Sequence, residues 1–237
     1  MFPPDRRASR RARKAAKLGR VTFRGWPADA LEFFDGLAAD NTKAYWQDNK
    51  PRYEQTVKAP MEELLAELAS EFGEGKIFRP YRDVRFSADK TPYKTHMGAT
   101  LAGGGYVELS AEGLAAGRGF WHMASDQLGR FRAAIADDAT GKALVDMLDV
   151  LGKQGIEPIA IGELKTAPKG YPKEHPRIEL LRKKGLATWK RWPVAAWLGT
   201  AKAKERIVEF LRASAPVYEW LEVNVGPSTM DGNSGGR

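Results

Sequence analysis

The sequence predicts an α+β fold in which a central antiparallel meander of about four to six strands is packed by N-terminal and C-terminal helices. Two observations lead to this prediction. Apolar residues recur at helical spacing near both ends of the chain, whereas short runs separated by turn residues fill its middle. Because the strands are grouped and do not alternate with helices, a doubly wound parallel sheet is excluded.

The N-terminal part predicts helices. A first helix is expected over residues 27–40, because its opening proline suits the first helical position and apolar residues follow at helical spacing. Residues 41–58 predict one or two helices with a kink at Pro51. Residues 60–73 predict an amphipathic helix that ends at a glycine.

The middle of the chain predicts the meander, and helices follow it. The expected strands cover residues 77–86, 96–101, 106–110 and 114–121. Glycine-rich and proline-containing turns between them are typical of antiparallel hairpins. Beyond them the sequence predicts a helix from Ser125, a second helix ending at Gly152, a strand at 156–161, a short helix after Pro176 and a last helix from about Thr200.

Most of the positive charge lies in the first twenty residues. This segment has eight basic residues and one acid, Asp5, so it holds seven of the eight net positive charges. A segment this charged and poor in apolar residues does not fold alone, so we expect residues 1–20 to be a disordered basic arm, with translation from Val21 as the alternative. Residues 21–225 are expected to form a single α+β domain, and residues 226–237 a flexible tail.

The composition excludes several kinds of chemistry. The chain has no cysteine, so disulfides, thiolate nucleophiles and cysteine-based metal sites are excluded. Its three histidines show no metal-ligand spacing. No apolar run approaches the roughly 18 residues that a membrane span needs. We therefore expect a cytoplasmic protein with no membrane partner and no metal site, and the sequence points to no cofactor.

Residues 79–96, the first basic motif, have five basic side chains, two acids and one histidine. If residues 77–86 form a strand, its alternation places Arg79, Asp83 and Arg85 on one face. Asp83 would then neutralise one arginine, and the other guanidinium would keep two parallel donors for a carboxylate or a phosphate.

Further donors in this motif add to the predicted anion site. The ligand-binding residues predicted here are Arg79, Arg82, Asp83, Arg85, Lys90 and Lys94. The alternative is internal salt bridging, which needs no ligand and contributes little on an exposed surface. The pattern is compatible with both a ligand site and internal salt bridging, and the excess of basic over acidic groups leaves donors for a ligand.

The second basic motif covers residues 165–185. Lys165 and Arg177 are its predicted ligand-binding residues. His175 precedes a proline at an expected helix N-terminus, where backbone N–H groups attract anions. His175 and His96 are therefore the candidate catalytic acid–base groups, and a polar capping role is the alternative for both.

Together the two motifs predict one pocket for a small phosphorylated or carboxylated ligand. An enzyme built on such a pocket would be a phosphoryl- or nucleotidyl-type transferase or hydrolase. Two alternatives stay open: a nucleic-acid-binding module that uses residues 1–20 and the same basic face, and a scaffold for a partner protein. Trp121, Trp189 and Trp192 could stack on bases, with burial as their other use. The oligomeric state is not predicted.

These motifs resemble a known family. The similarity lies in residues 78–96, 164–171 and 175–182, and it extends over about 23–222. In these segments the chain resembles the bacterial domain-of-unknown-function 2461 family, and residues 39–46 and 189–197 resemble its actinobacterial branch. One departure is Lys169, where arginine is usual. The resemblance implies one domain that starts near residue 21, and it implies no activity or catalytic residue.

Overall fold

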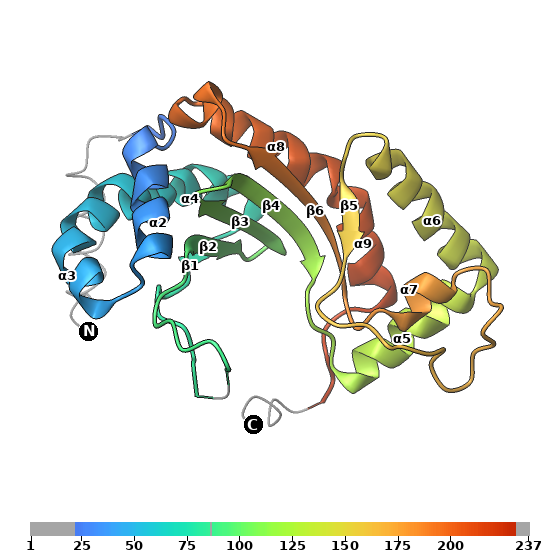
Figure 1. Cartoon of the computed structure of the whole chain (residues 1–237). Helices are drawn as coiled ribbons and strands as arrows, with labels where there is room; N and C mark the ends of the chain where they lie inside the picture. Colours follow the sequence, from blue (N-terminus) through green and yellow to red (C-terminus); the bar gives the residue numbers. More distant parts are fainter. Residues whose placement is uncertain (1–21, 86, 231–237) are drawn as a thin grey trace, which may run out of the picture.

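The computed structural model describes residues 22–85 and 87–230. Its strands are β1 (Gly75–Ile77), β2 (His96–Leu101), β3 (Gly105–Ser110), β4 (Gly113–Phe120), β5 (Glu157–Ile159) and β6 (Leu186–Pro193). They form one six-stranded sheet in the order β1-β2-β3-β4-β6-β5, and every neighbouring pair is antiparallel (Figure 1). Helices precede and follow the strands, so the predicted α+β class is confirmed.

The N-terminal part of the chain consists of one separate helix followed by three helical segments that are continuous with one another. They are α2 (Ala28–Ala39), α3 (Lys43–Arg52), a π-helical segment (Tyr53–Lys58) and α4 (Ala59–Phe72). The hydroxyl of Thr42 begins α3 by accepting a hydrogen bond from the Tyr45 N–H at 3.2 Å. Pro51 lies inside α3 and has no N–H to donate, so the regular ladder breaks and the π-helical segment follows.

The C-terminal helices flank β5 and β6. They are α5 (Ser125–Ala136), α6 (Asp138–Gly152), α7 (Ile178–Arg182), a 3-10 turn (Ala196–Gly199), α8 (Lys202–Ala213) and α9 (Ala215–Asn224). The carboxylate of Asp137 caps α6 by accepting from the Thr140 N–H at 2.9 Å. The single helix expected from Thr200 is two helices, which meet at Ser214 just before Pro216.

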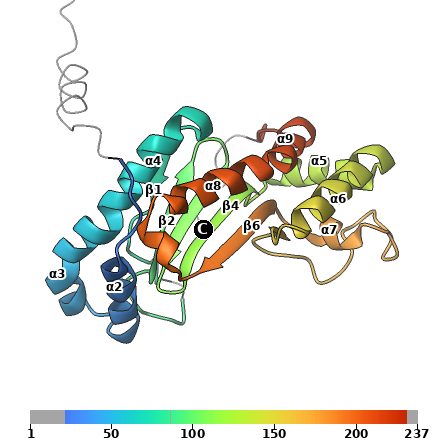
Figure 2. The same cartoon turned by 90° about the horizontal axis from the view of Figure 1, so that it is seen from above.

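The sheet curves like an arch. Helices α4, α8 and α9 pack on its convex face, where they contact β1, β2 and β4 (Figures 1 and 2). The core lies between these helices and the sheet, with fully buried side chains such as Leu109, Leu114 and Leu211. In the described part of the chain, no helix covers the middle of the concave face (Figure 1). That face is therefore where side chains of the sheet can meet a ligand.

The first predicted strand is shorter than expected. We expected residues 77–86 to be extended, but β1 ends at Ile77, and the described residues between it and β2, 78–85 and 87–95, form an irregular hairpin with an isolated bridge between Tyr81 and Tyr93. Pro80 and Pro92 each precede a residue of the bridge and cannot donate to a ladder, although their carbonyls accept from the Lys94 and Arg82 N–H groups opposite them. The alternation predicted for Arg79, Asp83 and Arg85 is therefore wrong.

Strand β6 was not predicted. Residues 186–193 contain two tryptophans on either side of two charged residues, Trp189 to Trp192, and this pattern does not show which face is buried. The strand forms because it pairs with β4 along its whole length and with β5 on its other side. The expected strand at 156–161 is present as β5.

The structure describes part of the predicted C-terminal tail but none of the predicted basic arm. Residues 1–20, the predicted basic arm, and residues 231–237 of the predicted tail lie outside the described residues. Within the predicted tail, Ser228 and Thr229 hydrogen bond to Asp126 at the start of α5. Arg130 also donates to the Pro227 carbonyl at 2.7 Å, so this part of the tail is attached to α5. Among residues 22–85 and 87–230, no helix is long and apolar enough to cross a membrane.

Candidate binding site on the concave face of the sheet

The register of the strands determines which side chains share the concave face. Residues directly opposite each other in antiparallel strands point to the same side of the sheet. One row across the face consists of Thr100, Tyr106, Gly117 and Trp189, and the next consists of Gly98, Glu108, Ala115 and Arg191. His96 belongs to a third row, opposite Ser110. Aromatic, acidic and basic groups from four strands thus lie on one surface.

Four aromatic side chains, Phe78, Tyr106, Trp121 and Trp189, form a contiguous aromatic platform on this face. The ring centres of Tyr106 and Trp189 lie 5.9 Å apart in a stacked arrangement, and Trp121 meets both rings edge-on. Phe78 extends the platform toward β1, with its ring centre 6.2 Å from that of Tyr106. Phe78 is 39% exposed and the other three are half-buried. A patch of rings that keeps contact with solvent is typical of a binding surface.

Glycines make room for the platform. A Cβ atom at Gly98 would collide with the Tyr106 hydroxyl, and one at Gly117 would collide with the Trp121 ring and lie 2.9 Å from the ring of Trp189. The two glycines therefore let Tyr106 approach the backbone of β2, and Trp121 and Trp189 approach that of β4. This close approach explains why two glycines occupy the middle of strands, where they otherwise weaken the sheet.

A partly buried carboxylate, that of Glu108, lies beside the platform. Its side chain is 15% exposed, and Oε2 accepts a hydrogen bond from the Tyr106 hydroxyl at 2.7 Å. His96 Nε2 lies 3.7 Å from Oε2, and Arg191 Nη2 lies 3.8 Å from Oε1. Arg191 also forms an ion pair with Glu112. Burial, followed by the bond to Glu108, raises the pKa of Tyr106, so this hydroxyl stays a donor.

His96 is placed for acid–base chemistry. Burial lowers its pKa below the ordinary 6.5; Glu108 acts against this shift, while Lys94 and Arg191 add to it. The imidazole is therefore neutral at pH 7 and offers one donor and one acceptor nitrogen. It lines a cavity of about 270 Å³ between α2 and the ends of β2, β3 and β6. Phe34 and Ala38 of α2 close the far side of that cavity.

The hairpin of residues 78–95 begins beside the platform, and most of its predicted ligand-binding groups have partners within it. Arg82 pairs with Asp89, and Arg85 pairs with Asp83 at 2.7 Å. The bond from Arg82 lowers the pKa of Asp89 to about 2, and the bonds from Arg85 lower that of Asp83 to about 2. Internal salt bridging, the alternative left open above, therefore accounts for these two arginines.

The remaining predicted groups of this hairpin divide between loop and platform. Lys90 donates to the Val84 carbonyl at 2.9 Å and belongs to the loop. Lys94 Nζ lies over the Phe78 ring, 5.3 Å from its centre, so it stands at the end of the platform. Arg79 is exposed, and its charge helps to lower the pKa of Asp83.

Asn41 fixes the hairpin to the helices. Its side-chain amide donates to the Tyr93 carbonyl at 3.1 Å and accepts from the Tyr93 N–H at 3.0 Å, as a paired strand would. Trp46 of α3 stacks on the Tyr93 ring, with centres 4.6 Å apart. The base of the hairpin is therefore positioned by the N-terminal helices.

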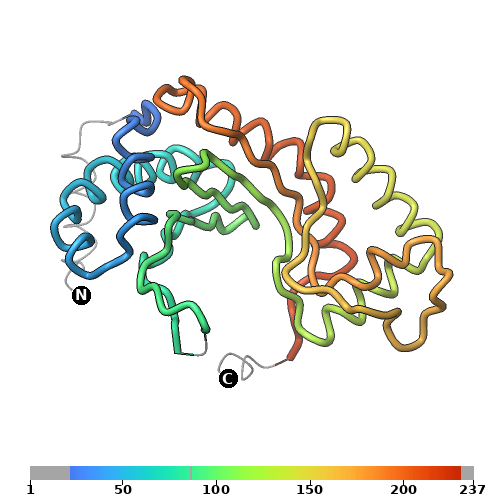
Figure 3. The backbone as a smooth tube through the Cα atoms, viewed as in Figure 1, coloured from blue at the N-terminus to red at the C-terminus, as the bar shows by residue number. Residues whose placement is uncertain are grey.

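The second basic motif lies at the opposite end of the sheet, between β5 and β6 (Figure 3). Arg177 there is occupied by structure: its side chain is 12% exposed, donates to the Ile135 and Ala136 carbonyls and pairs with Asp138. His175 Nδ1 accepts from the Arg177 N–H at 3.0 Å, which is the capping role considered above. The predicted Lys165 is exposed in the loop before α7. The structure does not bring His175 to His96.

Several groups of the concave face were not predicted as site residues. Tyr106, Glu108 and Arg191 come from strands separated along the chain, and the alternation of 106–110 indicates that the first two share a face. Of the three tryptophans considered for base stacking, Trp121 and Trp189 are partly exposed, whereas Trp192 is buried in the core.

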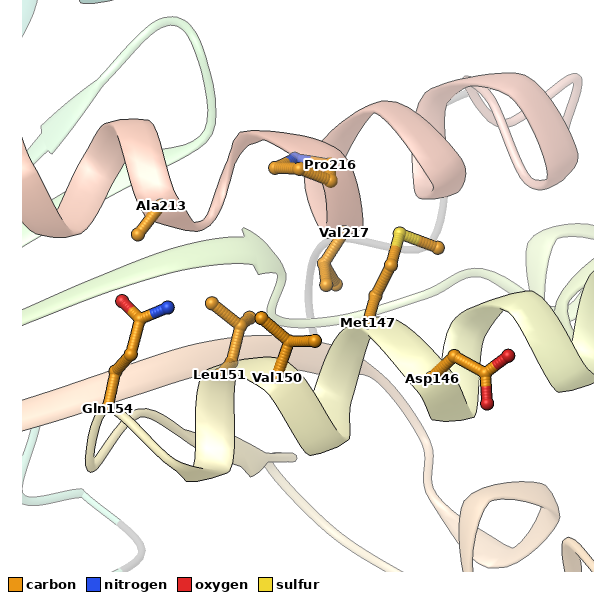
Figure 4. A pocket seen from close by; sticks show the side chains of 8 residues that line it. All are labelled: Asp146, Met147, Val150, Leu151, Gln154, Ala213, Pro216 and Val217. Carbon is orange, nitrogen blue, oxygen red and sulfur yellow. The ribbon is translucent and has the colours of Figure 1, made fainter.

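A second hollow is apolar and lies elsewhere. It has a volume of 280 Å³ and is located between α6 and the α8–α9 junction (Figure 4). Met147, Val150 and Leu151 line it from α6, and Pro216 and Val217 line it from α9. Among the described residues, no group of three or more metal-ligating side chains is positioned to hold an ion.

Fold and site together define the class: an α+β protein with helices on one face of an antiparallel sheet and an aromatic platform beside a buried carboxylate on the other. The chain belongs to the domain-of-unknown-function 2461 family, because the family model described as "Conserved hypothetical protein (DUF2461)" matches residues 29–220. The match does not distinguish the actinobacterial branch. No curated protein and no solved structure matches the chain.

Proposed function

We propose that the concave face binds a small ligand that combines a planar ring with an anionic group. The observation that carries this proposal is the aromatic platform, which remains partly exposed and ends at a lysine. Covering an exposed ring with a flat apolar surface favours binding, because water is released from both surfaces. Four adjoining rings make this the most extensive such surface that the described part of the sheet offers.

Lys94 and Arg79 are the proposed contacts for the anionic group. Lys94 Nζ stands over Phe78, so an anion held there lies beside a ring stacked on the platform. Arg79 follows Phe78 directly in the hairpin, and its side chain is exposed. Glu108 does not oppose an anion strongly, because Tyr106 donates to it and Arg191 faces its other oxygen.

The proposed site contains fewer basic residues than the pocket that the sequence predicts. Of the two basic motifs, only the first adjoins the platform, and Arg177 of the second is engaged by backbone carbonyls. Arg82 and Arg85 hold the hairpin together through Asp89 and Asp83.

If the ligand is a substrate, His96 is the proposed acid–base group. As a neutral imidazole it can take a proton from a hydroxyl or a water, and Glu108 then stabilises the imidazolium. Phosphoryl or nucleotidyl chemistry remains the proposed reaction class. His175 takes no part in it, because its Nδ1 is occupied at the far end of the sheet.

The test compares three probes on the full chain: thymidine 5′-monophosphate, thymidine and inorganic phosphate. Trp121 and Trp189 report binding directly through quenching of their fluorescence. We expect the monophosphate to bind at least about tenfold more tightly than either fragment, because it uses rings and cations together. Lys94→Gln should reduce this advantage, whereas the exposed Lys173→Gln is the matched control and should leave it unchanged.

Two results would contradict the proposal. One is the absence of quenching by all three probes. The other is equal loss of binding in Lys94→Gln and Lys173→Gln, which would show that the anion is attracted by overall charge and not held at the platform.

A further inference from the structure

We infer that the natural occupant of the concave face is a single-stranded nucleic acid, with bases on the aromatic platform and phosphates along the hairpin of residues 78–95. This inference rests on the proposed function, because the same rings and the same lysine make the contacts. It goes further by naming the ligand as a polymer. Three observations lead to it.

The first observation is the extent of the platform. Phe78, Tyr106 and Trp189 follow one another across the sheet with ring centres 6.2 Å and 5.9 Å apart, and Trp121 adjoins the last two. One small ring covers one or two of these side chains and leaves the rest in water. Successive bases of a single strand would cover all of them, as on other open sheets that stack two or three bases.

The second observation is the distribution of charge around the platform. The first basic motif has three more basic than acidic side chains, and it forms the hairpin that starts at Phe78. The Arg85 side chain is 77% exposed even though it pairs with Asp83, and Arg79 is also exposed. With Arg82 and Arg85 paired to Asp89 and Asp83, the excess consists of Arg79, Lys90 and Lys94, and several cations suit a backbone with one charge per nucleotide better than they suit a single small anion.

The positions of the acidic groups on this face favour a nucleic-acid backbone that lies along the hairpin. Glu108 and Glu112 both face Arg191, and Glu157 lies opposite Trp189 on the edge strand β5. Glu112 lies toward α2 and Glu157 at the far edge, whereas Glu108 lies beside His96, near Lys94, where Tyr106 and Arg191 face its two oxygens. Phosphates are favoured on the hairpin side and disfavoured beyond Trp189.

The third observation is the backbone beneath the rings. Gly98 lies against Tyr106, and Gly117 lies against Trp121 and Trp189, so at these two positions no side chain stands between the backbone and the rings that could read a base edge. Stacking on such a surface tolerates any sequence. A duplex keeps its bases inside the helix and cannot present them to the rings, so a single strand is the form that fits.

The experiment measures fluorescence anisotropy of the full chain with a ten-nucleotide oligothymidylate and with a duplex hairpin that has the same number of phosphates. The basic residues 1–20 attract both probes through counterion release, so the difference between the probes reports the concave face. We expect the single strand to bind at least about tenfold more tightly than the duplex. It should also bind more tightly than thymidine 5′-monophosphate.

Variants test the contributions of the aromatic rings and of the cations to binding separately. Phe78→Ser and Trp189→Ser should each weaken binding of the oligothymidylate at least about fivefold, whereas Trp197→Ser, a half-buried tryptophan on the 3-10 turn, should not. Arg79→Gln changes an exposed side chain and so preserves the fold. It should lower the slope of log affinity against log salt by about 0.7.

The outcomes distinguish the two proposals. Equal affinity for single strand and duplex, or full binding by Phe78→Ser, would overturn the nucleic-acid inference. If thymidine 5′-monophosphate then still quenches the tryptophans, the small-ligand proposal stands by itself. If neither the mononucleotide nor the oligonucleotide binds, both proposals fail.

Discussion

At the scale of single residues, Glu108 organises the concave face. Its carboxylate receives the Tyr106 hydroxyl, faces Arg191 and lies 3.7 Å from His96. A carboxylate that is 15% exposed needs such partners, since an unpaired buried charge is costly. These partners hold the ring of Tyr106 in place and keep a neutral imidazole beside it.

His96 makes the stability of the protein depend on pH in a defined direction. Its pKa in the folded protein is lower than the ordinary 6.5, so the unfolded chain binds more protons between these two values. The free energy of unfolding should therefore fall as the pH falls below about 6.5, and stop falling below the pKa of the folded state. The groups that face the imidazole are Glu108, Lys94 and Arg191.

Urea unfolding of His96→Gln between pH 7.5 and 4.5 should show a smaller acid-induced loss than the unchanged protein. His122→Gln is the matched control, because His122 is exposed, and it should retain the loss. A steeper acid-induced loss in His96→Gln than in the unchanged protein would show that Glu108, and not burial, dominates the environment of this histidine.

At the scale of elements, the hairpin of residues 78–95 depends on helices for its position. Pro80 and Pro92 prevent a regular ladder, so the contacts of Asn41 with both backbone groups of Tyr93 replace part of it. Arg82, bonded to Asp89 and Thr91, tightens the tip side of the loop. The cations proposed to hold the anion are thus positioned from outside the sheet.

Asn41→Ala should loosen this hairpin. The change leaves the N–H and the carbonyl of Tyr93, a residue only 5% exposed, without their partners, at a cost of about 1–3 kcal/mol. Hydrogen exchange should accelerate in residues 80–94 more than in the sheet. Asn49→Ala is the control, since Asn49 donates only to the Tyr45 carbonyl within the helices. Unchanged exchange in the hairpin would contradict this account.

At the scale of the whole molecule, the two basic motifs have different uses. They flank a six-stranded sheet at its two ends, so a ligand of a few ångströms cannot touch both. The first motif borders the aromatic platform, and the second ties α5, α6 and α7 together through Arg177. Two motifs of similar composition are therefore assigned different roles: we propose that the first takes part in binding, and the second connects helices.

Arg177→Gln and Arg79→Gln test that division. Arg177 donates to two carbonyls at the end of α5, and its loss should lower the free energy of unfolding by about 2–4 kcal/mol. Arg79→Gln should change stability by no more than about 0.5 kcal/mol, because the side chain is exposed. Urea unfolding at pH 7 measures both. Equal effects of the two changes would show that the motifs do not differ in this way.

Much of the fold follows from local patterns in the sequence. The amphipathic spacing that predicts residues 60–73 agrees with α4, and the turns around Gly103 to Gly105 agree with the β2–β3 hairpin. Such features depend on neighbours a few residues apart, so the chain specifies them locally. Strand β6 is the exception, because its pairing with β4 and β5 outweighs an ambiguous pattern of tryptophans and charges.

The sequence by itself determined the α+β class, the resemblance to the family and the segment from Arg79 to His96 as the chemically unusual part. Only the tertiary structure decided where the candidate site lies. Alternation shows that Tyr106 and Glu108 share a face, but which face stays open depends on where α4, α8 and α9 pack. The platform joins Phe78 to Trp189 across strands more than a hundred residues apart, and that proximity is a property of the register.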